Sequence, residues 1–293
     1  MPRRVAYLAV TAGVMLTLAG CAFSFFGYER RAEWRNPEER ACIASGAVRA
    51  SAWIQSVSAV NDRGACGIVK PLKVSGIGQG TVQIGPTATL NCPMTNFVER
   101  WLGEAVQPAA FAWFGAPVVS IKQISAYSCR PRNNERGESL SEHAFGNALD
   151  VAAFTFADGR TITVKRDWDG ADPNARGFLR EVFAAGCARF KTALGPGVKY
   201  HGDHFHFDLA HHNDAGTSRY CRPRLDAAPQ RPMGDPWLMS QARGGLDWGV
   251  TGSVSSDGDD DLGEFLSEMP PAVAANLDDP FGVSELHGAS PLD

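Results

Sequence analysis

Two short segments of the sequence concentrate the residue types that bind metals and move protons. The first runs from Ser141 to Asp150 and the second from His201 to Asp208, and six of the seven histidines lie in or just after them. Imidazole nitrogen and carboxylate oxygen suit a tetrahedral zinc shell, and a catalytic zinc site uses three protein ligands and leaves one position for water. We therefore predict a Zn²⁺ site whose ligands are His143, Asp150 and His206.

The spacing in the second segment predicts a strand with two different faces. Phe205 and Phe207 alternate with His204, His206 and Asp208, so a strand would bury the rings and point both imidazoles the other way. We expect His204 to lie beside the metal-bound water, where it would act as a general base or orient a protonated intermediate. Asp208 is expected to hold a ligand histidine by a hydrogen bond. The alternative is a cluster of mutually hydrogen-bonded polar side chains without a metal.

The first segment needs a bend to serve the same site. His143 and Asp150 are seven residues apart, too far for adjacent positions on one strand, and Gly146 between them permits a sharp turn. Glu142 is expected to be a solvated loop carboxylate, with a role as an alternative base also open.

The elements that must position these segments are helices and strands in one α+β domain. Apolar spacing predicts helices over 93–106 and 174–194, β-branched residues predict a strand over 118–127, and glycines punctuate short strands between 42 and 82. We expect a small, mostly antiparallel sheet with the His-x-His strand at its centre. The flanking helices should pack on the sheet face that lies away from the metal.

Cysteine usage indicates an exported, disulfide-stapled domain. Cys21 directly follows a predicted lipoprotein signal peptide, described below, and is set aside. Six cysteines remain, an even number that favours three disulfides with fifteen pairings open. A thiolate zinc site would need a pair such as Cys-x-x-Cys, and the sequence has none. The six are Cys42, Cys66, Cys92, Cys129, Cys187 and Cys221.

The N-terminus predicts export and a lipid anchor. Arg3 and Arg4 precede an apolar run, and residues 1–20 resemble a lipoprotein signal peptide that ends just before Cys21. By that resemblance Cys21 is lipidated and anchors the chain on the periplasmic side of the envelope, and Ala22 after it favours the outer membrane. The alternative is a plain signal anchor with an incidental cysteine.

The remaining organisation follows from composition. We expect a tether over 21–40, one folded domain over 41–225 and a disordered acidic tail over 226–293. The formal net charge of -4 gives no basic excess for a phosphate backbone, so nucleic acid is not an expected partner.

The metal pattern and several further motifs carry a resemblance to known families. The pattern His-x6-Asp followed by His-x-His resembles the zinc peptidase superfamily of lysostaphin-like endopeptidases, D-Ala-D-Ala carboxypeptidases and the Hedgehog signalling domain. Over roughly residues 42–221 the chain is also similar to the bacterial extensin-like C-terminal domain family. The motifs that carry this similarity are Asn91-Cys92-Pro93, Val106-Gln107-Pro108-Ala109-Ala110, Tyr127-Ser128-Cys129-Arg130, Arg132-Asn133, Ser141-Glu142-His143, Gly146-Asn147-Ala148-Leu149-Asp150 and Asp203-His204-Phe205-His206.

The wider resemblance implies a zinc-peptidase-like fold and a hydrolytic activity. Arg130 would then hold the substrate carbonyl or carboxylate and stabilise an oxyanion, although a surface salt bridge is an equal alternative. The amides of peptidoglycan peptides are the expected substrate in the periplasm. A non-catalytic, zinc-containing tether that binds the cell wall is the alternative function, because such a fold also serves binding.

Overall fold

The computed structural model describes residues 30–225 and 231. Three expected features lie outside the described residues. They are the signal peptide, the first part of the tether with Cys21 (residues 21–29), and the acidic tail except for residue 231. In the described part of the chain, no helix is long and apolar enough to cross a membrane.

A single large sheet organises the described residues. The strand order of this sheet is β1-β4-β5-β6-β7-β10-β9-β11, and β8 pairs with β7. The strands β2 and β3 form a separate two-stranded sheet. The pairs β5–β6 and β9–β11 are parallel, whereas the other pairs are antiparallel. The strands are β1 (Ile54–Ser56), β2 (Val60–Asn61), β3 (Gly67–Ile68), β4 (Leu72–Ile77), β5 (Val82–Leu90), β6 (Val118–Ser125), β7 (Ala148–Phe156), β8 (Thr161–Thr163), β9 (Thr192–Leu194), β10 (Phe205–Asp208) and β11 (Tyr220–Arg222).

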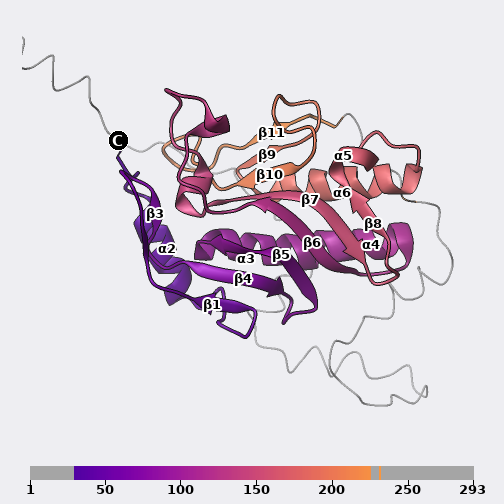
Figure 1. Cartoon of the computed structure of the whole chain (residues 1–293), viewed down its shortest axis with the longest axis horizontal. Helices are drawn as coiled ribbons and strands as arrows, with labels where there is room; N and C mark the ends of the chain where they lie inside the picture. The colour runs from indigo at the N-terminus through magenta and orange to yellow at the C-terminus, as the bar shows by residue number, and fades with distance from the viewer. Residues whose placement is uncertain (1–29, 226–230, 232–293) are drawn as a thin grey trace, which may run out of the picture. The chain divides into compact units, whose positions relative to one another are not determined.

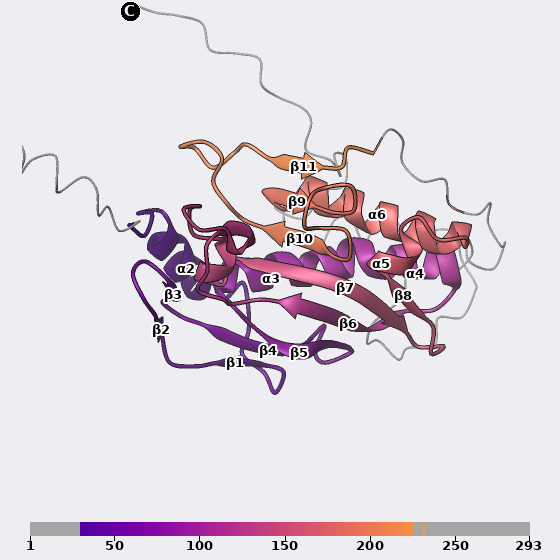
Figure 2. The same cartoon turned by 45° about the horizontal axis from the view of Figure 1, so that its top comes forward.

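The longer helices gather on one side of this sheet, as Figures 1 and 2 show for α3, α4 and α6. The fold is therefore a mixed α+β arrangement, as expected, and β10 is an interior strand between β7 and β9. Only His206 of the His-x-His motif lies in β10, whereas His204 lies in the bend just before the strand. The helical segments are α2 (Arg35–Ala44), α3 (Cys92–Trp101), the π-helical turn η1 (Leu102–Val106), α4 (Gln107–Phe114), α5 (Val164–Asp167), α6 (Pro173–Arg189) and the 3₁₀ turns η2 (Arg132–Asn134) and η3 (Glu142–Phe145).

The helix expected over 93–106 is present and longer than expected. The Asn91 side chain caps α3 by accepting a hydrogen bond from the Met94 backbone N–H at 2.8 Å. The chain then passes through η1 directly into α4, which ends where Gly115 adopts a left-handed conformation with φ 66°.

The helix expected over 174–194 is shorter than expected. It is α6, and it ends at Arg189 because Phe190 turns to extended backbone. The next residues form β9, which pairs with both β10 and β11. The apolar residues of this segment belong to a buried strand. Sequence spacing alone does not distinguish such a short apolar strand from one more helical turn.

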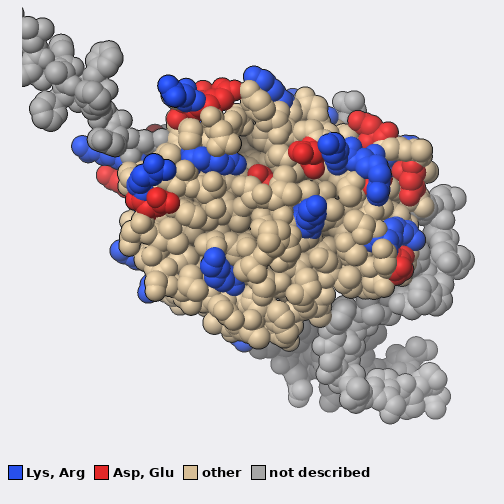
Figure 3. Space-filling model, viewed as in Figure 1, with Lys and Arg blue, Asp and Glu red and all other residues tan. Residues whose placement is uncertain are grey.

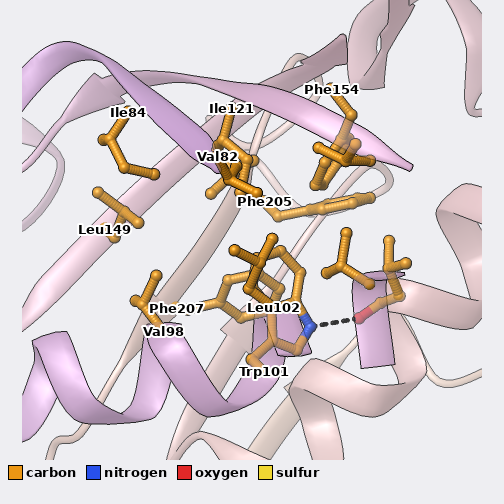
Figure 4. Close-up of a cluster of buried hydrophobic side chains, with 14 of the residues drawn as sticks. Val82, Ile84, Val98, Trp101, Leu102, Ile121, Leu149, Phe154, Phe205 and Phe207 are labelled. Atoms are coloured by element: carbon orange, nitrogen blue, oxygen red, sulfur yellow. Dashed lines mark hydrogen bonds between the residues drawn. The ribbon is translucent and has the colours of Figure 1, made fainter. Parts of the chain in front are cut away.

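The hydrophobic core fills the space between the sheet and these helices. Figure 4 shows side chains of β5, β6, β7 and β10 pointing toward Trp101 of α3, whose indole N–H donates to the Val182 carbonyl of α6 at 2.9 Å. Phe207 of β10 packs against Trp101 and Gly186, and a Cβ on Gly186 would lie 2.3 Å from the Phe207 ring. Glycine is thus what lets α6 approach the strand this closely.

The six expected cysteines form three disulfides, and the structure supplies the pairing that the sequence left open. Each pair ties segments that are distant in the sequence, with Cα atoms 5.5 to 5.9 Å apart. The pairs are Cys42–Cys92, Cys66–Cys129 and Cys187–Cys221.

Part of the expected tether belongs to the folded domain. The helix α2 begins at Arg35, so the boundary expected at residue 41 falls inside it. Its buried residues are Arg35 and Glu39, which form ion pairs with Glu142 and Arg31. A helix held by charged contacts lacks the apolar stripe by which a sequence reveals a buried face.

Candidate metal centre

The three expected ligands meet on the sheet face that lies away from the helices. Asp150 of β7 and His206 of β10 are cross-strand partners, and Asp150 Oδ1 lies 2.8 Å from His206 Nδ1. His143 reaches the same place from η3, where its Nε2 lies 3.2 Å from Asp150 Oδ2 and 3.3 Å from His206 Nδ1. One donor atom from each residue lies within 4.8 Å of the others, and all three residues are buried.

The turn before β7 explains how His143 arrives there. Ser141 caps η3 by accepting a hydrogen bond from the His143 N–H. Gly146 then takes a left-handed conformation, with φ 61°, and reverses the chain into β7. A Cβ at this position would lie 2.3 Å from the Ile68 side chain, so the expected bend requires glycine for both its conformation and its space.

Outer hydrogen bonds fix the direction of both imidazoles. His143 Nδ1 lies 2.6 Å from the Ala126 carbonyl, to which it donates, so its Nε2 faces Asp150 and His206. His206 Nε2 lies 2.9 Å from Asp208 Oδ2, which leaves Nδ1 on the side of Asp150. A metal-binding histidine characteristically has a carbonyl or carboxylate on its second nitrogen, and the residues present therefore fit a divalent metal such as zinc.

Electrostatics in the metal-free form favour a positive charge between the donors. Burial opposes a charged His206, but the hydrogen bonds and charges of Asp150 and Asp208 outweigh it and raise its pKa to about 10. Burial likewise opposes a charged Asp150, but His143 and His206 together hold the pKa of its carboxyl well below the usual range. A proton on His206 thus occupies the place that the donor set offers to a cation.

Two more histidines complete a ring of imidazoles around this point. His204 Nδ1 lies 2.8 Å from Asp203 Oδ1, and His204 Nε2 lies 3.8 Å from Asp150 Oδ2. The His201 ring centroid lies 5.2 Å from that of His204 and 5.7 Å from that of His206, and burial lowers the pKa of His201. His204 therefore lies beside the three expected metal ligands, at the position expected for a general base that acts on the metal-bound water.

The structure places Arg130 in the loop after β6. Its backbone carbonyl accepts a hydrogen bond from the Ser141 N–H at 3.0 Å, which joins this loop to the start of η3. The residue is half-buried, and the expected role of its guanidinium toward substrate stays a prediction.

A model of the family described as the extensin-like protein C-terminus matches residues 40–222. The chain belongs to this family. The matched part of this extensin-like domain contains all three disulfides and the residues His143, Asp150, His204 and His206. No curated protein and no solved structure matches the chain.

Proposed function

We propose that this extensin-like chain is an envelope lipoprotein whose domain is a zinc-dependent peptidase acting on amide bonds of peptidoglycan peptides. The observation that carries the proposal is the convergence of His143, Asp150 and His206, with both imidazoles oriented by outer hydrogen bonds. Three protein donors leave a fourth position for water. When bound, zinc polarises an amide carbonyl and lowers the pKa of a bound water.

The residues around the donors have matching roles. Asp203 accepts from His204 Nδ1, which keeps His204 Nε2 on the side of Asp150 and available to take a proton. In amide hydrolysis the water oxygen joins the carbonyl carbon, the C–N bond breaks, and the water proton passes through His204 to the leaving nitrogen. By the resemblance stated above, Arg130 would hold a substrate oxygen during this step.

The sheet face that carries these residues supports a polymeric, anionic substrate. Its strands expose Lys73, Gln83 and Lys122, while their alternate residues are buried in the core. Figure 3 looks onto this face, where single basic groups stand on a broad uncharged surface and acidic groups lie near the top and toward the rim. The same view shows the surface hollowed toward the top. Peptidoglycan combines hydroxyls, amides and stem carboxylates, which suit this polar and weakly basic surface.

The test compares three forms of the mature chain on purified muropeptides, with products identified by mass spectrometry. The zinc-loaded wild type should cleave at least one muropeptide. His204→Ala should keep its zinc and lose about 10²–10⁴-fold in turnover, whereas His206→Ala should lose both zinc and activity. If the wild type carries one zinc and digests no muropeptide, the peptidase proposal is wrong. Binding to sacculi without cleavage would instead favour the tether alternative.

The anchor is tested separately. Cells grown with a fatty-acid analogue should label the wild-type chain and place it in the membrane fraction, whereas Cys21→Ser should be unlabelled. Recovery of unlabelled wild-type protein in the soluble periplasmic fraction would contradict the lipid anchor.

A further inference from the structure

The helix α2 makes a buried, two-pronged ion pair with the turn that presents His143. Two guanidinium nitrogens of Arg35 lie 2.6 Å from the two carboxylate oxygens of Glu142. The side chains are only 9% and 12% exposed, so water screens the contact little. The expected solvated loop carboxylate is therefore wrong for Glu142, because an arginine more than a hundred residues earlier in the chain covers it.

This ion pair braces both ends of η3. Glu142 directly precedes His143, and its Oε2 also accepts a hydrogen bond at 2.6 Å from Asn147, which lies just after the turn. Asn147 Oδ1 in turn accepts from the Asn91 amide at 2.9 Å, which links the turn to the start of α3. The Arg35 guanidinium also lies 3.8 Å from the centre of the Phe145 ring. The ion pair with Arg35 and the hydrogen bond from Asn147 thus hold the turn that carries His143 around the Glu142 carboxylate.

The same helix contacts the segment after β10, the strand that carries His206. Trp34, which directly precedes α2, stacks on His211 with ring centroids 3.8 Å apart and an interplanar angle of 7°. Glu38 Oε1 lies 3.1 Å from His211 Nε2. Helix α2 and the residue before it therefore contact both the turn that carries His143 and the segment that follows β10.

A second set of contacts holds α2 without involving Glu142. Glu39 pairs with Arg31, and its Oε2 accepts a hydrogen bond from the Val69 N–H at 2.8 Å. The Cys42–Cys92 disulfide fastens the C-terminal end of the helix to α3. Arg35 and Glu39 are thus two buried charged residues on one helix, and of the two it is Arg35 that forms the ion pair with the turn that carries His143.

We propose that Arg35 is a positioning residue for the metal centre, acting through Glu142 on the direction of His143. This inference rests on the metal site of the proposed function but not on its catalysis. Without Arg35, Glu142 would be a buried carboxylate lacking its main partner and would turn toward water. The turn η3 would relax, and a metal site tolerates only about 0.5 Å of misplacement in its ligands.

The experiment measures zinc affinity in the full mature chain by competition with a chromophoric chelator. Arg35→Met should weaken zinc binding by about 10–100-fold, the range seen when outer supports of metal ligands are removed. The matched control is Glu39→Gln, which breaks the other charged contact of α2 and should change the zinc Kd less than about threefold. Cobalt substituted for zinc supplies a second readout, since its visible absorption spectrum should change in Arg35→Met and stay unchanged in Glu39→Gln.

Two further variants keep the proposal falsifiable if Arg35→Met folds poorly. Arg35→Lys keeps the charge but loses the two-pronged geometry, so it should lie between wild type and Arg35→Met. Arg35→Met combined with Glu142→Gln should recover most of the lost affinity, because no unpaired buried charge remains. Equal zinc affinity and cobalt spectra in wild type, Arg35→Met and Arg35→Lys would overturn the proposal. So would an equal loss in Glu39→Gln, or a wild type without zinc. A wild type that binds zinc but cleaves nothing would leave it standing.

Discussion

The two faces of the sheet are held together by different forces, and strand β10 belongs to both. On the helix side, Phe205 and Phe207 are fully buried among aromatic rings. On the other side, His206 lies between the carboxylates of Asp150 and Asp208. Apolar packing is non-directional and tolerates changes of charge elsewhere, whereas the polar cluster depends on where each proton resides. Substitutions on the two faces of one strand should therefore fail in different ways.

The largest effect is expected on the packed face. Phe207→Ala removes a ring that stacks on Phe190 at 4.7 Å between centroids and packs on Trp101, so it should lower the free energy of unfolding by about 3–5 kcal/mol. Urea titration measures the loss. The variant protein that remains folded should still bind zinc, because no donor atom is touched. A loss below about 1 kcal/mol would show that the ring contributes little to the core.

The polar face should show its strength as a dependence on pH. In the metal-free protein the pKa of His206 is raised from 6.5 to about 10. A raised folded-state pKa stabilises the fold fully below about pH 6.5, and the contribution is lost as pH rises through about 10. The urea midpoint of the metal-free wild type should therefore fall between about pH 7 and 9.5. Saturating zinc should abolish this fall, since a zinc-bound His206 carries no proton to lose between about pH 7 and 9.5.

The matched control for this pH dependence is His206→Gln, which removes the titrating ring and keeps an amide for hydrogen bonding. Its urea midpoint should vary much less over the same range. Identical slopes in the wild type and in His206→Gln would show that another group sets the pH dependence.

The same contrast decides what the sequence could predict. Alternation in β10 maps directly onto two faces, so the strand, its buried rings and the direction of His206 followed from local spacing. The meeting of His143 with Asp150 also followed, because Gly146 marked the turn between them. These features depend on residues close together in the chain.

The features that could not be predicted depend on distant partners. The buried face of α2 consists of Arg35 and Glu39, whose partners include Glu142 and the Val69 amide, and neither partner is close to the helix in the sequence. Residues 192–194 continue the apolar pattern of α6 and become a strand only through pairing with β10 and β11. The disulfide pairing likewise depends on how these distant segments pack.

An intermediate effect is expected at Asp208, which orients a ligand without binding the metal. Asp208→Asn keeps an acceptor for His206 Nε2 but removes the negative charge, and zinc binding should weaken by about 10–100-fold. The variant should also lower the pKa of His206, so protons compete less with zinc for this imidazole, and this gain is greater at pH 7 than at pH 9. The net loss of zinc affinity should therefore be larger at pH 9. Titration with zinc at both pH values measures this. An unchanged zinc affinity at pH 9 would show that Asp208 does not support the metal site.

The smallest effect is expected on the exposed part of the polar face. Lys122 lies three residues from Ser125, the cross-strand partner of Asp150, which places it about 10 Å along β6 from the candidate site. Lys122→Gln should leave stability within about 0.5 kcal/mol of wild type and raise KM up to about fivefold for muropeptides with free carboxylates, with kcat unchanged. Lys73→Gln is the matched control, since Lys73 lies on β4, two strands away from β6, and should change KM less. The effect should shrink at high salt and with amidated muropeptides. Equal changes in both variants would mean that the face attracts substrate only by its general charge, whereas a selective Lys122 effect would identify an anion-binding position beside the candidate metal centre.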